Sequence, residues 1–157
     1  MMRPRRGLRV TEGPQCGWFS EGEKRAFYGN VFGVAEESNR MGIRLEGESI
    51  LLPRGGGVGE ETGGSGRLSA GGEMLSEGVA LGAVQVAESG KPIILFVEQQ
   101  TTGGYPKIAN VISADFHSLG QLRPRDEVRF ELVGLETARR LLREQEEWLA
   151  SAELVAG

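Results

Sequence analysis

Residues 93–112 read IILFVEQQTTGGYPKIANVI, in which two apolar runs flank a polar segment. Both runs, 93–97 and 108–112, are rich in β-branched side chains, which pack well on a pleated surface, so each predicts a strand. The segment between them, 99–107, is dense in hydrogen-bond donors and acceptors and contains a Gly-Gly pair that permits close approach of a ligand. A long hairpin turn accounts for the Gly-Gly pair equally well, and the residues alone leave both readings open.

The same strand signals recur on both sides of this stretch. Apolar residues that alternate or cluster between turn residues predict strands at 8–10, 31–34, 41–45, 83–86 and 128–133, with a further short strand at 50–52. Many short strands at turn-spaced intervals, with few helices among them, favour a mainly β, closed barrel over a βαβ sheet.

Two helices are expected beside these strands. Ser20 and Glu23 have the spacing of a capping box ahead of apolar residues 26–28, which predicts a short helix near the N-terminus. A C-terminal helix is expected over about 135–150, where charged residues of opposite sign stand four apart. One face of that helix collects Leu135, Ala138, Leu142, Gln145 and Leu149.

A chain of 157 residues has the size of one domain. Its 25 glycines are about twice average usage, and the stretch 54–72 is glycine-rich with almost no apolar residues, so it predicts a mobile loop. We expect a disordered extension at 1–7, a barrel over 8–134 that contains this loop, and a helix with a tail over 135–157.

Composition also limits the function classes. The formal net charge of −4 argues against a nucleic-acid partner. No apolar run approaches the roughly 18 residues of a membrane span, and the basic start is too short for a targeting segment, so a cytoplasmic protein without a membrane partner is expected. Cys16 and His117 are the single cysteine and histidine, too few for the usual metal ligand sets, and we expect no bound metal.

Polar turns carry the candidate ligand-binding residues. In 99–107, threonine hydroxyls and glutamine amides can orient an amide or a carboxylate. In the turn 38–42, the planar guanidinium of Arg40 is suited to anchoring a carboxylate or a phosphate, although a plain hairpin turn is the competing reading. Asp115 and His117 face different directions on a helical turn, so a solvated or capping role is expected for Asp115. No residue qualifies as an activated nucleophile.

Several longer segments bear a family resemblance. They are ESNRMGIRLEG at 37–47, GEMLSEGV at 72–79, GAVQV at 82–86, QTTGGYPKIA at 100–109, and the AD and QLRP motifs within 114–124. In this order they resemble the KipA family, also described as the C subunit of 5-oxoprolinase (PxpC), allophanate hydrolase subunit 2-like or biotin-dependent carboxyltransferase-like. The resemblance spans roughly residues 8–149 and implies a cyclophilin-like barrel.

This resemblance also implies an activity. In the 5-oxoprolinase complex, three kinds of subunit together use ATP to open 5-oxoproline to glutamate, so KipI/PxpB-like and PxpA-like partners are implied. Activating an amide carbonyl needs donors around its oxygen and a largely dry pocket. On this reading Thr101 and Thr102 are the catalytic oxygen-binding residues. The substrate-binding residues would be Asn39, Arg40, Gln100, Gly103, Gly104, Tyr105 and Lys107.

Two alternatives stay open. One is the carboxyltransferase domain of a biotin-dependent, urea-type carboxylase, to which biotin would arrive on another protein because no Ala/Val-Met-Lys-Met attachment segment is present. The other is a non-enzymatic KipA-type module that counteracts a kinase inhibitor by direct contact. The resemblance covers only the C-terminal half of the family, so the N-terminal half is expected to be missing and a site between the halves would be incomplete.

Overall fold

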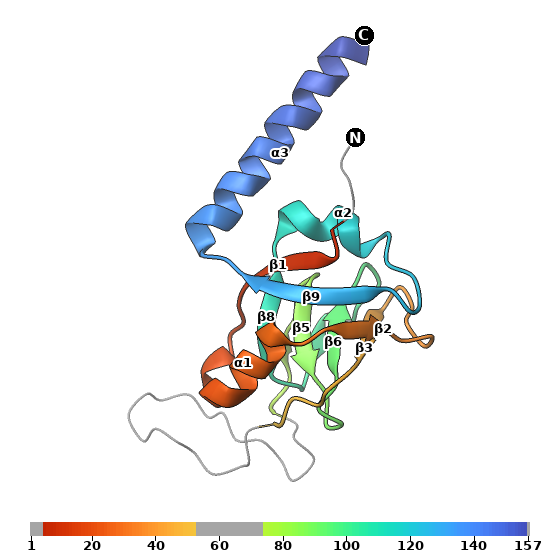
Figure 1. Ribbon diagram of the computed structural model, residues 1–157. Coiled ribbons are helices and arrows are strands. Elements are labelled where there is room, and N and C mark those ends of the chain that lie inside the picture. Colours follow the sequence, from red (N-terminus) through yellow and green to blue (C-terminus); the bar gives the residue numbers. More distant parts are fainter. Residues whose placement is uncertain (1–4, 53–73, 157) are drawn as a thin grey trace.

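Seven strands close into a barrel in the computed structural model of this protein, which describes residues 5–52 and 74–156, with side chains as far as residue 151 (Figure 1). The barrel strands are β1 (Gly7–Glu12), β8 (Lys107–Val111), β5 (Ala83–Val86), β6 (Pro92–Leu95), β3 (Gly42–Glu46), β2 (Phe32–Val34) and β9 (Glu127–Leu132), in that order around the barrel. The predicted mainly β closed barrel, with a short helix near the N-terminus and another at the C-terminus, is confirmed.

Pairing of the first and last strands closes the barrel. β1 lies antiparallel to β8 and parallel to β9, with Leu8 opposite Phe130 and Val10 opposite Val111. These inward-facing side chains are all buried. Closure leaves the barrel strands without a free edge, which removes a common route to aggregation. Gly7, which the sequence placed in a disordered extension, belongs to β1.

The first helix, α1 (Glu21–Gly29), packs its Phe27 into the core. The Phe27 ring stacks on Phe130 of β9 with centroids 4.5 Å apart, and Phe32 lies beside both. Aromatic pairs of this kind contribute about 0.5–1.5 kcal/mol beyond the area they bury. They hold α1 against the barrel wall.

The predicted capping box is only half formed. Ser20 Oγ accepts a hydrogen bond from the backbone N–H of Glu23 at 3.2 Å, as expected. The Glu23 carboxylate instead accepts from the backbone N–H of Leu51 at 2.8 Å. The backbone N–H of Ile50 donates to Gly90 O at 2.8 Å. The expected strand at 50–52 is therefore wrong, because a side chain and a turn carbonyl take the donors that a strand ladder would use.

Other strand boundaries shift by a few residues. β6 ends at Leu95, short of the predicted end at residue 97, although the backbone N–H groups of Phe96 and Glu98 still donate to the carbonyls of Met41 and Arg40. After β8, a 3-10 turn (Ser113–Asp115) leads into α2 (Phe116–Leu119), where one helical turn was predicted. The expected mobile loop at 54–72 lies outside the described residues.

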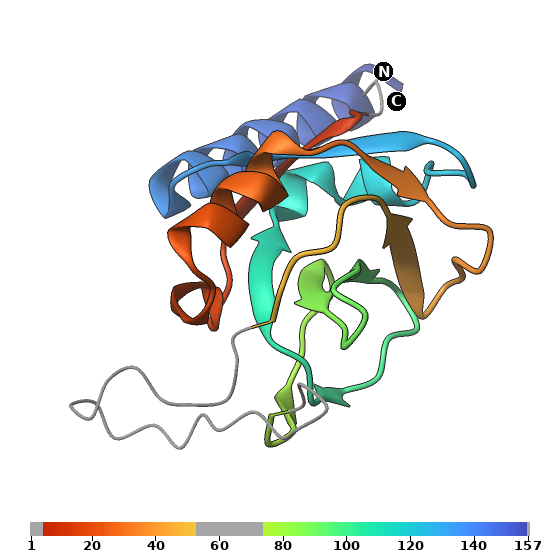
Figure 2. The same ribbon diagram turned by 60° about the horizontal axis from the view of Figure 1, so that its bottom comes forward.

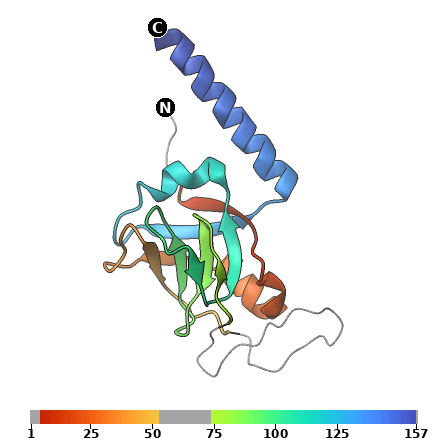
Figure 3. The same ribbon diagram turned by 180° about the vertical axis from the view of Figure 1, so that it is seen from behind.

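The C-terminal helix, α3 (Leu135–Ala156), is longer than predicted and stands away from the barrel (Figures 1 and 3). It is tied to the barrel by Gln145, whose Nε2 donates to Ala114 O at 2.9 Å. In Figure 2, α3 lies at the opposite end of the molecule from the small sheet of β4 (Glu77–Gly78) and β7 (Thr102–Gly103). Within residues 5–52 and 74–156, no helix has the length and apolar character needed to cross a bilayer.

Candidate functional site

The polar segment 99–107 does not fold as a simple hairpin turn. Its residues 102–103 form β7, which pairs antiparallel with β4, so that Gly103 lies opposite Glu77. Backbone bonds on both sides extend this pairing, from Val79 N to Thr101 O at 3.1 Å and from Met74 N to Gly104 O at 2.6 Å. The segment is thus held by residues 74–79, well before it in the chain.

A buried cation lies at the end of this segment. Lys107 begins β8, and only 3% of its side chain is exposed. Its Nζ lies 2.5 Å from Oε1 of Glu77, a close but poorly directed ion pair, and no other described residue accepts a hydrogen bond from it. An ammonium group carries three N–H donors, so most of this donor capacity is left unused.

Gln15 braces this ion pair from the other side. Its Nε2 donates to Oε1 of Glu77 at 2.7 Å, and its Oε1 accepts from the backbone N–H of Lys107 at 3.0 Å. The backbone N–H of Gln15 also donates to Lys107 O at 3.1 Å. The chain reaches this position through Gly13, where a Cβ would collide with the Lys107 carbonyl and lie 2.7 Å from Ala109 N. We call Gln15, Glu77 and Lys107 the Lys107 cluster.

The Gly-Gly pair also has a packing reason. Gln85 is 7% exposed, and a Cβ at Gly103 would collide with its side-chain amide. A Cβ at Gly104 would lie 3.2 Å from Met74 O. Glycine at 103 therefore lets the backbone approach a buried amide closely.

The Lys107 cluster has a buried positive end at Lys107 and a more exposed negative end at Glu77. The ammonium of Lys107 holds the pKa of Glu77 below its usual range, and the Gln15 amide acts in the same direction, while desolvation opposes them. Glu77 is 41% exposed, so it forms the solvent-facing end of the cluster. A buried ammonium with unused donors is suited to stabilising negative charge on a carbonyl or carboxylate oxygen.

The remaining predicted residues of the segment lie nearer the surface. Gln100, Thr101 and Thr102 are exposed, whereas Gly103, Gly104 and Tyr105 are half-buried. Their exposed hydroxyl and amide groups can contact a ligand or a partner that arrives from solvent.

Asn39 and Arg40 occupy a separate turn. Asn39 Oδ1 accepts from the backbone N–H groups of Met41 at 2.8 Å and Gly42 at 3.3 Å, so its side chain shapes the turn before β3. The Arg40 guanidinium is 72% exposed and pairs with Glu98 at 2.7 Å. The structure thus brings Arg40 to the start of the polar segment and Lys107 to its end, with no direct contact between Arg40 and the Lys107 cluster among the described residues.

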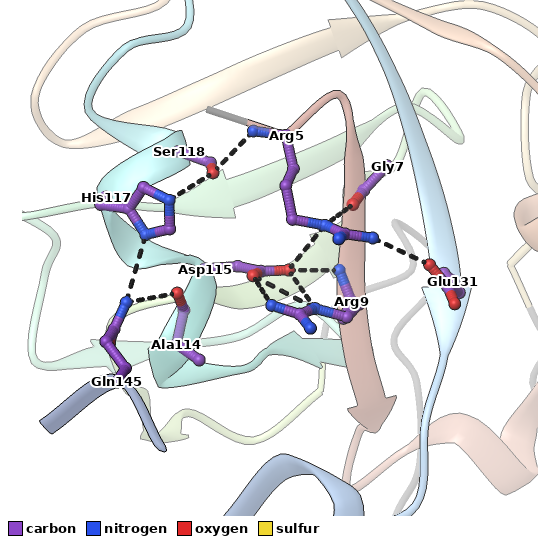
Figure 4. A network of polar contacts seen from close by, with 9 residues as sticks. All are labelled: Arg5, Gly7, Arg9, Ala114, Asp115, His117, Ser118, Glu131 and Gln145. Carbon is purple, nitrogen blue, oxygen red and sulfur yellow. Dashed lines mark hydrogen bonds and ion pairs between the residues drawn. The ribbon is translucent and has the colours of Figure 1, made fainter. Parts of the chain in front are cut away.

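The expectation for Asp115 is wrong. Asp115 is 0% exposed and makes no side-chain cap on α2. Its carboxylate accepts from the backbone N–H of Arg9 at 2.8 Å and forms a two-pronged ion pair with the Arg9 guanidinium, 2.5 Å at the closest (Figure 4). This contact raises the pKa of Arg9. Asp115 is therefore neither solvated nor a helix cap, because the fold buries its carboxylate against the guanidinium of Arg9 in β1.

His117 takes no part in that pair. Its Nε2 lies 3.3 Å from Ser118 Oγ and its Nδ1 lies 3.5 Å from Gln145 Nε2 (Figure 4). The absence of an acid–base pair between Asp115 and His117 agrees with the expectation that they face different directions. Among the described residues, no three His, Cys, Asp or Glu side chains group in a way that would hold a metal ion.

Sequence reasoning missed Gln15, Gln85 and Glu77 as site residues. Glu77 lies inside one of the segments that carry the family resemblance, which was the available signal for it. Gln15 follows a Gly-Pro turn and Gln85 lies within an apolar strand, and each is polar at a position that the fold buries. Buried polar side chains need partners, so a lone glutamine in a strand pattern is a usable hint.

This closed β-barrel belongs to a known class of domain. Residues 2–132 match the family model described as carboxyltransferase domain, subdomain A and B. The chain belongs to this carboxyltransferase domain family.

Individual proteins are similar to this chain in sequence or in fold over part of their length. The chain is 42% identical over 120 residues to the C subunit of 5-oxoprolinase from Haemophilus influenzae, covering 76% of this chain and 34% of that protein. It is 32% identical over 141 residues to the corresponding 5-oxoprolinase protein of Escherichia coli, covering 90% of this chain and 40% of that protein. The urea carboxylase of Kluyveromyces lactis superimposes with a TM-score of 0.76 at 25% identity, covering 94% of this chain and 13% of that one. The chain therefore spans well under half the length of each.

Proposed function

We propose that this chain is part of a subunit of an ATP-dependent 5-oxoprolinase-type complex that opens 5-oxoproline to glutamate. Two relatives are named as the C subunit of 5-oxoprolinase, and the chain matches 34% and 40% of their lengths. The complex would supply ATP use through KipI/PxpB-like and PxpA-like partners, together with the remainder of the subunit.

The observation that carries this proposal is the buried Lys107 ammonium with unused donors. Opening a lactam adds water to the carbonyl carbon, breaks the C–N bond and gives the ring nitrogen a proton. Negative charge develops on the carbonyl oxygen, and a preorganised cation in a site of low dielectric stabilises it strongly. Lys107 would meet that oxygen from the Glu77 side, where the cluster faces solvent.

The other predicted residues take supporting roles. Thr101 and Thr102 would donate hydroxyl hydrogen bonds to the same oxygen, and the half-buried Gly103–Gly104 backbone would let the substrate approach. Arg40 would anchor the substrate carboxylate with Asn39 holding its turn, while Gln100 and Tyr105 border the entrance. Because Arg40 is now paired with Glu98, its anchoring role requires Glu98 to yield to the substrate.

Reconstitution tests this function. The chain, with the remainder of its subunit and the PxpB-like and PxpA-like partners, is assayed for glutamate release and for ATP hydrolysis that depends on 5-oxoproline. Lys107→Met should lower glutamate release by about 100-fold or more, the usual loss for one oxyanion donor. The matched control is Lys91→Met, on an exposed turn, which should leave the rate unchanged.

Two outcomes would contradict the proposal. One is 5-oxoproline-dependent ATP hydrolysis that continues unchanged when this chain is left out. The other is full activity of a folded Lys107→Met complex. If Lys107→Met does not fold, Thr102→Ala replaces it, since Thr102 is exposed and its loss should lower the rate without unfolding the barrel.

A second candidate function is carboxyl transfer from biotin carried by another protein. The family description and the likeness to a urea carboxylase favour it. Here the Lys107 ammonium would hold the carboxylate in transit instead of a lactam oxygen. Carboxybiotin turnover with urea, without glutamate release, would identify this function. A non-enzymatic regulatory contact would instead show as a tight complex with a KipI-like protein that tolerates Thr101→Ala and Arg40→Ala.

A further inference from the structure

Helix α3 leaves the apolar side chains of residues 135–151 at least partly exposed. It has 22 residues and therefore extends for about 33 Å. None of its side chains from 135 to 151 is fully buried, and Leu135, Trp148 and Leu149 are 57%, 44% and 44% exposed. In proteins most of the stability of a helix comes from packing of its apolar face. The barrel supplies only part of that packing.

The contact with the barrel ends near the middle of the helix. Ala138 and Leu142 line a shallow hollow of about 200 Å³ against the end of β8, and Gln145 makes the hydrogen bond to Ala114. Beyond Gln145 the helix projects past the barrel (Figures 1 and 3). Leu141 and Trp148 are seven residues, or two turns, apart, so they share one side of the helix beside the barrel contact.

Charges on α3 are separated along its length. Residues 135–143 hold three arginines and one glutamate, a net charge of +2, whereas residues 144–151 hold three glutamates and no basic residue, a net charge of −3. A lone helix prefers the opposite order, with acidic residues near its N-terminus and basic residues near its C-terminus. Among the described residues, Arg143, Glu146 and Glu147 make no ion pair.

We propose that α3 is a homodimerisation helix, which packs antiparallel against α3 of a second copy of this chain. A twofold axis near Glu144 and Gln145 places Leu141 of one copy against Trp148 of the other, twice. The same operation sets the basic half of each helix beside the acidic half of its neighbour, so the charges that oppose the helix dipole become complementary. A parallel pair would bring like charges together, which disfavours that arrangement.

Dimerisation through α3 does not obstruct the Lys107 cluster. Helix α3 and the β4–β7 sheet lie at opposite ends of the molecule (Figure 2). The pairing is independent of the catalytic role proposed for Lys107, and a failure of either leaves the other intact.

Sedimentation equilibrium of the full chain tests the pairing. The wild-type chain should dimerise reversibly, and Trp148→Ser should raise the dimer dissociation constant about tenfold or more, because central aromatic residues carry much of the energy of an interface. The control is Leu51→Ser, which alters an apolar residue that is 66% exposed on another surface and should leave the constant unchanged. Both sites are exposed, so each variant should fold, and circular dichroism would check this.

Charge exchange tests the antiparallel order. Reversing Glu147 to arginine should weaken the dimer, and adding Arg140→Glu to the same chain should restore it, because these two positions flank the Leu141–Trp148 side of the helix. A wild-type chain that stays monomeric at every concentration, or a dimer indifferent to Trp148→Ser, would overturn the proposal.

Single cysteines in a Cys16→Ser background test the geometry directly. Glu144→Cys lies near the proposed twofold axis and should crosslink to itself on mild oxidation. Thr137→Cys lies seven residues earlier on the same side and should not, because in the antiparallel pair it faces the far half of the other helix. Equal crosslinking of both variants would indicate a parallel pair and would refute the arrangement.

Discussion

Lys107 and Asp115 are the charged residues buried within the described part of the protein, and the two are neutralised differently. Asp115 receives the Arg9 guanidinium and the Arg9 backbone N–H together, so its carboxylate is well satisfied. Lys107 has a single poorly directed acceptor in Glu77. The Arg9–Asp115 ion pair stabilises the fold, whereas the Lys107 ammonium keeps hydrogen-bond donors available for a ligand.

Replacing Asp115 should test the structural assignment. Asp115→Asn keeps the shape but leaves the Arg9 guanidinium, with a side chain 17% exposed, without its counter-charge, and we expect a loss of about 3–5 kcal/mol in the free energy of unfolding. Urea unfolding followed by circular dichroism measures this loss. Glu131→Gln removes an exposed ion pair with Arg5 and a weaker attraction to Arg9, and it should cost under about 1 kcal/mol. Equal effects of the two variants would contradict the assignment.

Glu77 should give the cluster a pH dependence. Its pKa is lowered in the folded state, so its contribution to stability is complete above its unfolded value of about 4.3 and is lost as pH falls through the folded value. Wild type should exceed Glu77→Gln in urea midpoint at pH 7, and the difference should shrink below about pH 4 and vanish. A difference that is constant from pH 7 to pH 3 would rule out ionisation of Glu77 as the cause. The effect is modest because Glu77 is 41% exposed.

Among the elements, the turn between β1 and the 3-10 turn (Cys16–Trp18) decides how closely Gln15 reaches the Lys107 cluster. The backbone N–H of Gly13 donates to Ile108 O at 2.9 Å, which continues the β1–β8 pairing past the end of β1. The chain then passes against the Lys107 carbonyl, where only hydrogen fits at position 13. Packing of this element therefore sets the geometry of the candidate site.

Gly13→Ala should be destabilising for this reason. The added methyl group must displace backbone of β8, so we expect a loss of about 1–3 kcal/mol, the usual cost of overpacking. Gly17→Ala is the matched control, since a Cβ at Gly17 meets nothing within 4 Å, and it should change stability by about 0.5 kcal/mol or less. Thermal unfolding of the two variants makes the comparison, and a Gly13→Ala chain as stable as Gly17→Ala would show that β8 can yield.

At the scale of the whole molecule, the barrel and α3 are expected to contribute unequally to folding stability. The barrel closes through β1 and β9, and β9 ends at Leu132, before α3 begins. The helix adds one hydrogen bond from Gln145 and partial burial of residues such as Leu142. The barrel is therefore expected to be self-sufficient.

A chain that ends at residue 134 should keep its fold. We expect the free energy of unfolding to fall by no more than about 2 kcal/mol, because a net hydrogen bond and partial apolar burial contribute little. Circular dichroism should lose helical signal while the β-barrel transition stays cooperative. Loss of cooperative unfolding would show that α3 is part of the core.

Some of this structure follows from local sequence. The strand over 108–112, the Ser20 cap and the amphipathic helix from Leu135 depend on alternation, capping and helical spacing within a few residues, and all three were predictable. Glycine at 103–104 indicated close approach, but only the fold shows that Gly103 pairs with Glu77.

The remainder was decided by contacts between residues far apart in the chain. Gln15 and Lys107 are 92 residues apart, and Arg9 and Asp115 are 106 apart. Which charges are buried, and with which partners, depends on strand order and on the parallel closure of β1 with β9, neither of which has a local signal. Sequence alone therefore determined most of the strands and the two longer helices of this protein, whereas tertiary structure determined the β4–β7 pairing and the buried charges, because desolvation acts on a side chain only once the barrel has closed around it.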